Sequence, residues 1–181
     1  MNKDSKLSEA EILIAEFNYA AQTSFQANED RVKIFNLLVL NIGSIIIALF
    51  FTESAKILTN QIIGTTLILL AFIGVLFLMQ LGRLRTAWID SVKSMNKIKD
   101  YYIKKFPEIE EAFLWKSTTV PRILKLTSIS FLLSITMIAI NLITFWVGIY
   151  LLSGIFWVSV LFSIFFLILQ IFFLNFIYKR K

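Results

Sequence analysis

The sequence contains no cysteine and no histidine among its 181 residues. Without cysteine the chain forms no disulfide, and thiols give no indication of its redox compartment. The usual ligands of zinc, copper, haem and iron–sulfur clusters are also missing, as are the Ser-His-Asp and Cys-His arrangements of nucleophilic catalysis. The composition therefore predicts no metal site, no cofactor and no conventional enzyme.

Charge is scarce as well. Charged residues make up only 17% of the chain, against roughly a quarter in ordinary soluble domains. The run Leu126–Tyr178 contains no Asp, Glu, Lys or Arg. A membrane-spanning helix needs about 20 apolar residues, so this run is long enough for two spans and a tight turn. No soluble helix pair is this apolar on every face, so the sequence predicts an integral membrane protein.

Apolar stretches predict four transmembrane helices, at residues 34–51, 61–82, 123–150 and 156–178. Ser153-Gly154 suits the turn between the last two spans. Thr118 and Thr119, which precede Pro121, suit a capped start of the third span. This pattern predicts an all-α fold.

Two polar segments predict a cytosolic helical extension, at residues 7–33 and 83–120. Ser8 and Glu11 have the spacing of a capping box, which marks the start of a helix. No Gly or Pro occurs before Gly43, so we expect this helix to run directly into the first span. The second span is likewise expected to continue as a helix to Pro107, which ends it, and residues 108–116 to form a short amphipathic helix.

The distribution of cations predicts the orientation. All but one of the 18 Lys and Arg lie in residues 1–33, 83–125 and 179–181, and Lys56 alone lies on the opposite side. The positive-inside rule then places both termini in the cytoplasm. Abundant Ile, Phe, Lys and Asn are typical of a low-GC bacterial genome. We therefore expect a single domain over residues 1–181, multi-pass in a bacterial inner membrane and in contact with its lipid.

Small and polar residues form a stripe along one face of the predicted third span: Thr127, Ser130, Ser134, Asn141, Thr144 and Gly148. Such residues let helices approach closely and bond across their interfaces. They also solvate ions along a water-filled path in an oligomer. Helix packing is the more common role of such a stripe, and both interpretations stay open. The other spans add shorter polar sets: Asn41, Ser44 and Ala48 in the first, and Ser159, Ser163 and Gln170 in the fourth.

A second candidate site lies where the predicted spans enter the cytoplasm, and it comprises Glu29, Asp30, Arg31, Arg83 and Arg85. These groups are expected to pair if the first two helices are antiparallel neighbours. Alternatively, the arginines join Lys93, Lys97 and Lys99 in binding an anion such as a nucleotide phosphate, or contact anionic lipid. Nothing beyond net charge favours nucleic acid, which we do not expect as a partner.

The amphipathic cytosolic helices need a hydrophobic partner. They bury their apolar faces against each other, or they form an oligomeric coiled coil in which Asn28 sets the register. Both arrangements are compatible with the sequence.

The stretch Ile12–Asn41, with its Glu16-Phe17-Asn18 element, resembles the helix that leads into the first span of SLATT-type and four-span SMODS-associating proteins. These small bacterial membrane effectors are encoded beside nucleotide second-messenger synthases in antiphage systems. The resemblance covers about 30 residues and the general layout. The families differ from this chain in span number or in having larger soluble parts, so their ligand and trigger do not carry over. The resemblance implies oligomers that perturb the inner membrane once activated.

These observations predict an oligomeric inner-membrane protein that forms or gates a pore, as an effector of antiphage defence, with a nucleotide-type ligand or a cytosolic protein as its activator. The alternative is a non-conducting anchor or scaffold whose cytosolic helices recruit a soluble partner. Liposome flux distinguishes the two.

Overall fold

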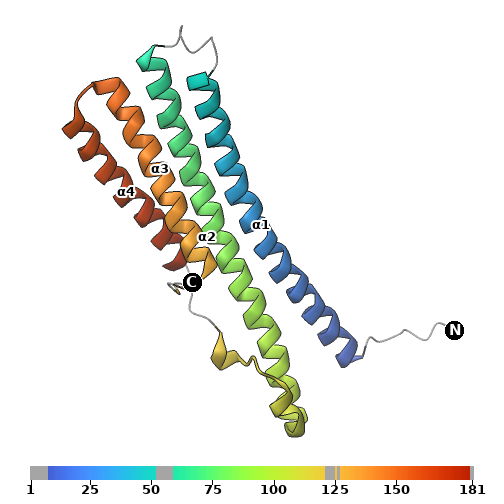
Figure 1. The fold of residues 1–181 in the computed structure, drawn as a ribbon. Coiled ribbons are helices and arrows are strands. Elements are labelled where there is room, and N and C mark those ends of the chain that lie inside the picture. Colours follow the sequence, from blue (N-terminus) through green and yellow to red (C-terminus); the bar gives the residue numbers. More distant parts are fainter. Residues whose placement is uncertain (1–7, 52–58, 121–124, 126, 180–181) are drawn as a thin grey trace, which may run out of the picture. The chain divides into compact units, whose positions relative to one another are not determined.

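The fold consists of four long α-helices and two short 3-10 helices within the residues described by the computed structural model, which are 8–51, 59–120, 125 and 127–179. In chain order they are α1 (Glu9–Phe51), α2 (Asn60–Lys105), η2 (Pro107–Ala112), η3 (Ser117–Thr119), α3 (Ile129–Ser153) and α4 (Phe156–Lys179) (Figure 1). Each α-helix is long and apolar enough to cross a membrane. The chain is thus all-α over the described residues, and its composition is that of a multi-pass membrane protein.

The first helix begins as the sequence predicts. The Ser8 backbone N–H donates to Glu11 Oε2 at 2.7 Å, and the Glu11 N–H donates to Ser8 Oγ at 3.2 Å. This reciprocal capping box satisfies backbone donors that a helix start otherwise leaves unpaired. The expected continuity of α1 into the first span and of α2 beyond the second is confirmed. The predicted start at residue 7 lies outside the described residues, as do Lys56, Pro121 and residues 180–181.

The chain divides into two compact units, and α1 and α2 each contribute to both. Unit 1 comprises Met1–Asp30 and Leu84–Ile123, and unit 2 comprises Arg31–Arg83 and Leu124–Lys181. The divisions fall close to the boundaries predicted between the cytosolic segments and the spans. We therefore describe each unit by itself.

Unit 1 packs the first part of α1 against the second part of α2. At one end Tyr101 donates to Glu9 Oε1, and Lys105 Nζ lies 3.6 Å from Glu9 Oε2. The buried positions on α1 are Ala20 and Ala27.

Helical spacing in the sequence predicts an apolar face at Leu7, Ala10, Ile14, Phe17, Ala21 and Ser24, of which Leu7 lies outside the described residues. The face of α1 that is buried in unit 1 differs slightly from this prediction. Ile14 is exposed, while Leu13, one residue earlier, is half-buried. The sequence pattern allowed both registers, because Leu13 and Ile14 are equally apolar.

The short helix predicted at residues 108–116 is confirmed only in part, because it is of the 3-10 type and ends at Ala112. The structure has the 3-10 helix η2 at Pro107–Ala112 and a second 3-10 turn, η3, at Ser117–Thr119. The Asn96 side chain donates to the Lys116 carbonyl at 2.9 Å, so the residues after η2 are held by a contact with α2 that periodicity within residues 108–116 does not indicate.

Unit 2 has an aromatic core formed by α2, α3 and α4. Ala71 and Val75 of α2 meet Phe145 of α3 and Phe166 of α4, and all four are buried. The two phenylalanine rings stack with centroids 4.2 Å apart. This core fixes how the polar side chains of α3 face their neighbours.

The predicted ends of the last two spans differ in accuracy. The Ser153–Gly154 turn is confirmed, since Gly154 adopts the left-handed conformation, with φ 67°, that ends α3. The predicted start of α3 is too early, because Ser128 caps the helix by accepting the Phe131 N–H at 3.3 Å. Thr118 and Thr119 belong to η3 instead.

Candidate functional site

The polar stripe predicted for the third span lies inside unit 2. Its buried members on α3 are Ser130, Ser134, Asn141, Thr144 and Gly148. Thr127 differs, because it precedes α3 and is exposed. In a single copy of the chain this face of α3 is therefore covered by neighbouring helices, which is the arrangement that helix packing requires.

Asn141 is the centre of this buried face. Its side chain is fully buried, and Nδ2 donates to Oε1 of the equally buried Gln170 on α4 at 3.2 Å. A methyl group at Gly74 of α2 would collide with the Asn141 amide. Helices α2, α3 and α4 thus meet at this point. Gly74 leaves the space that the Asn141 amide occupies, and the Gln170 amide is the hydrogen-bond partner of Asn141.

The pairing of the two amides is incomplete. Within the described residues Asn141 Oδ1 and Gln170 Nε2 have no hydrogen-bond partner. Buried amide groups that lack a bond are destabilising in an apolar surrounding. The contact between α3 and α4, which we call the seam, therefore contains one amide–amide bond and two buried amide groups without a partner among the described residues.

Glycines also set the approach of α2 to α3. A Cβ built on Gly64 would lie 2.8 Å from the Gly148 carbonyl oxygen, and one on Gly148 would lie 2.8 Å from Ile68 Cγ1. Both distances are closer than real Cβ atoms come. Small residues at such crossings let helix backbones approach closely in a membrane. Gly148 of the predicted stripe therefore has a packing role, and its partner Gly64 was missed by sequence reasoning.

Hydroxyl groups along the seam bond within their own helices. Ser134 donates to the Ser130 carbonyl at 2.8 Å, Thr144 to the Ile140 carbonyl at 2.8 Å and Ser159 to the Ile155 carbonyl at 3.1 Å. A hydroxyl satisfied in this way can be buried between helices without a partner across the interface. These side chains are suited to close packing.

Arg31 and Ser130, which the sequence placed in two separate candidate sites, meet in unit 2. Arg31 is buried, and its Nη1 donates to Ser130 Oγ. The bond joins α1 to the first turn of α3. A buried guanidinium needs such acceptors, because an uncompensated charge is costly away from water.

The rest of the predicted juxtamembrane set is divided between the units. Glu29 and Asp30 belong to unit 1, and Arg83 is an exposed residue of unit 2. Arg85 of unit 1 is buried, with its guanidinium carbon 4.7 Å from the centre of the Trp88 ring, a cation–π arrangement. The ion pairing of this set and its anion binding both stay predictions.

Uncharged polar side chains of α1 are exposed in unit 2, whereas most of those on α3 are buried. Asn36, Asn41 and Ser44 are exposed in unit 2, while Ile34, Leu38 and Ile42 form the buried side of the same helix. Asn36 lies close to the boundary with unit 1, whereas Asn41 lies well inside the apolar stretch. Polar side chains within this apolar stretch are thus left at the surface on α1.

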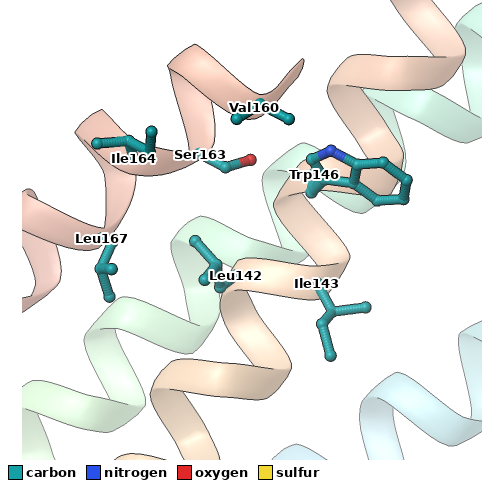
Figure 2. Close-up of a pocket in the computed structure, with 7 residues that line it drawn as sticks. All are labelled: Leu142, Ile143, Trp146, Val160, Ser163, Ile164 and Leu167. Atoms are coloured by element: carbon teal, nitrogen blue, oxygen red, sulfur yellow. The ribbon is translucent and has the colours of Figure 1, made fainter. Parts of the chain in front are cut away.

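An apolar groove of about 290 Å³ lies between α3 and α4 (Figure 2). Leu142, Ile143 and Trp146 line it from α3, and Val160, Ser163, Ile164 and Leu167 from α4. The Ser163 hydroxyl oxygen is itself buried. The groove therefore offers hydrocarbon contacts, of the kind that lipid acyl chains make.

Unit 1 has a smaller apolar hollow of about 150 Å³. Its lining residues are Leu13, Ile14, Phe17, Ile98, Lys99, Tyr102 and Phe113. Of the lysines that the anion interpretation invoked, Lys99 lies here, with Nζ 5.9 Å from the centre of the Phe113 ring. Lys93 and Lys97 are exposed on α2.

No cluster of three or more metal-ligating side chains occurs among residues 8–51, 59–120, 125 and 127–179. Comparison with protein-family models, curated proteins and solved structures gives no match. Inference about function therefore depends on where the residues of this chain lie: polar side chains of α3 and α4 that are buried inside unit 2, and a few polar side chains that stay exposed on the otherwise apolar outer side of α1.

Proposed function

We propose that this chain self-associates in a bacterial inner membrane, with both termini in the cytoplasm, and forms or gates a polar path bordered by the exposed face of α1. One observation carries the proposal: α1 leaves two amides and a hydroxyl exposed within its apolar stretch, at Asn36, Asn41 and Ser44. The α3 stripe, which the sequence also suggested as a path lining, is used inside the unit.

Apolar residues beside these polar ones give the proposed path a gate. Leu40 and Ile47 are 65% and 60% exposed, and with Asn36 they follow the middle of the exposed side of α1 at helical spacing. Rings of such side chains close a pore by excluding water from it. Activation would then separate or rotate the α1 helices. A role in antiphage defence, with a nucleotide-type or protein activator, is the biological setting that the resemblance of Ile12–Asn41 favours.

Ion or dye release from liposomes that contain only the purified full-length chain tests this proposal. We expect release that rises with the protein-to-lipid ratio, and greater release for Leu40→Ser, which would hydrate the gate. The matched control is Phe165→Ser, because Phe165 is an equally exposed apolar residue (67%) on α4. Vesicles that stay tight at every protein concentration, with wild type and Leu40→Ser alike, would contradict the proposal.

A second function is favoured by one feature of unit 1. Leu114 and Trp115, next to η2, are 82% and 56% exposed, which suits the docking of a cytosolic protein or contact with lipid. We propose as the alternative a non-conducting scaffold that recruits a soluble partner here. A cytosolic protein that co-purifies stoichiometrically with wild type and is lost with Leu114→Asp, from vesicles that do not leak, would favour this alternative.

A further inference from the structure

Asn41 poses a problem that the single chain does not solve. It lies eight residues beyond Lys33, or roughly 12 Å along the helix, and it is exposed among apolar neighbours. None of the described residues donates to its amide or accepts from it. An amide that faces hydrocarbon without a hydrogen-bond partner is strongly unfavourable, so a partner for Asn41 is expected within the membrane.

Most other polar side chains of the spans are buried inside unit 2, bond within their own helix or lie near a helix end. The Asn141 amide bonds Gln170 inside unit 2, and the exposed Thr136 hydroxyl donates to the Leu132 carbonyl of its own helix at 3.0 Å. Gln61 is near the start of α2, and Asn175 is near the end of α4. Asn41 is different because it combines depth, exposure and an amide oxygen that needs a donor, which its own helix cannot supply because its backbone N–H groups are already bonded.

The residues around Asn41 form a narrow edge of α1. Leu37, Asn41, Ser44 and Ala48 follow one another at spacings of four, three and four, and all are exposed. This is the spacing of the seam between two helices that pack in parallel. Ser44 and Ala48 are small enough to let a second helix come close.

We infer that this edge, which we call the Asn41 edge, binds the same edge of a second copy of the chain. An amide carries both a donor and an acceptor, so two copies of Asn41 related by a twofold axis can satisfy each other, as an isologous contact requires. The inference deepens the proposed function, since it rests on its self-association, but it does not depend on conduction. Leu40 and Ile47 remain beside the contact and are available to border a path.

The absence of native cysteine allows a direct test by disulfide cross-linking. We would reconstitute single-cysteine variants of the full-length chain in liposomes, Ser44→Cys and Ala48→Cys, with Val39→Cys and Ile46→Cys as controls. The control positions are also exposed on α1, but they lie about half a turn away. A disulfide requires Cα atoms about 4.4–6.8 Å apart, so only the edge in contact should cross-link efficiently upon oxidation.

We expect Ser44→Cys and Ala48→Cys to give at least about fivefold more dimer than the controls, with little loss when lipid is added in excess. Asn41→Leu in the Ser44→Cys background should reduce dimer about fivefold or more, while helix content by circular dichroism stays unchanged. Equal cross-linking at both edges, or none at Ser44 and Ala48, would overturn the inference. Cross-links at the Asn41 edge in vesicles that stay tight would contradict the proposed pore and support the contact. Vesicles that leak without cross-links at this edge would support the pore and contradict the contact.

Discussion

At the scale of single residues, the missing side chain of Gly74 leaves the space in unit 2 that the Asn141 amide fills. Gly74→Ala would place a methyl group against the Asn141 amide, and overpacking of this kind costs about 1–3 kcal/mol. We expect the variant to unfold at lower denaturant concentration in detergent micelles. Gly43→Ala is the matched control, because a Cβ there meets nothing within 4 Å, and alanine in a helix is favoured over glycine by about 1 kcal/mol. Equal stability of the two variants would contradict the packing described for Asn141.

The amide pair between α3 and α4 is the second prediction at this scale. Gln170→Leu should destabilise the chain by about 1–3 kcal/mol, because it leaves the Asn141 amide buried without its partner. A double-mutant cycle with Asn141→Ala should give a coupling energy of about 0.5–2 kcal/mol, the range found for polar pairs within membranes. Additive effects would show that the 3.2 Å contact does not stabilise the fold.

At the scale of the elements, the turn between α3 and α4 depends on one backbone conformation. Gly154 has φ 67° and open space around its Cβ position, so a side chain there is disfavoured by the backbone alone. We expect Gly154→Ala to lose about 1–2 kcal/mol of unfolding free energy and Gly154→Asn to lose less, since Asn tolerates this conformation better. Unfolding in micelles measures both, and an alanine variant as stable as wild type would exclude the role of this cap.

The elements also show what the sequence could and could not predict. Helix continuity, the Ser8–Glu11 capping box and the Gly154 turn depend on local chemistry, and all three were predictable. The start of α3 and the form of residues 107–119 were not, because Ser128 and Thr119 are equally good caps in the sequence and Asn96 contacts Lys116 from another helix.

The candidate site was likewise predictable from the sequence only where it depends on a single helix. Periodicity placed Ser130, Asn141 and Gly148 on one face of α3, and the structure buries this face. Their partners Gly64, Gly74 and Arg31 lie on other helices, and no periodicity within one helix identifies a contact between two. For the same reason the sequence ranked the stripe of α3 above the polar residues of α1, although Asn36, Asn41 and Ser44 of α1 are the ones left exposed.

At the scale of the whole molecule, the charge distribution predicts where each end of the chain lies. A reporter that is active only in the cytoplasm should be active when fused after Lys181, and inactive when inserted beside Lys56. We expect this result because cations that flank predicted spans on one side favour the cytoplasmic side. Activity of the two fusions in the opposite sense would contradict the topology and the assignment of unit 1 to the cytoplasm.

The structure buries most uncharged polar side chains of α3 inside unit 2 and leaves those that α1 contributes to this unit exposed, and cysteine labelling tests this difference most directly. Single-cysteine variants in leaky vesicles would be treated with a membrane-impermeant maleimide at Asn36, Leu40 and Ile47 of α1, at Ser134 and Thr144 of α3, and at the lipid-facing Phe165 of α4. We predict labelling at the α1 positions and little at the other three. Labelling of Ser134 and Thr144 with α1 protected would contradict the account, because it would place water along α3 instead.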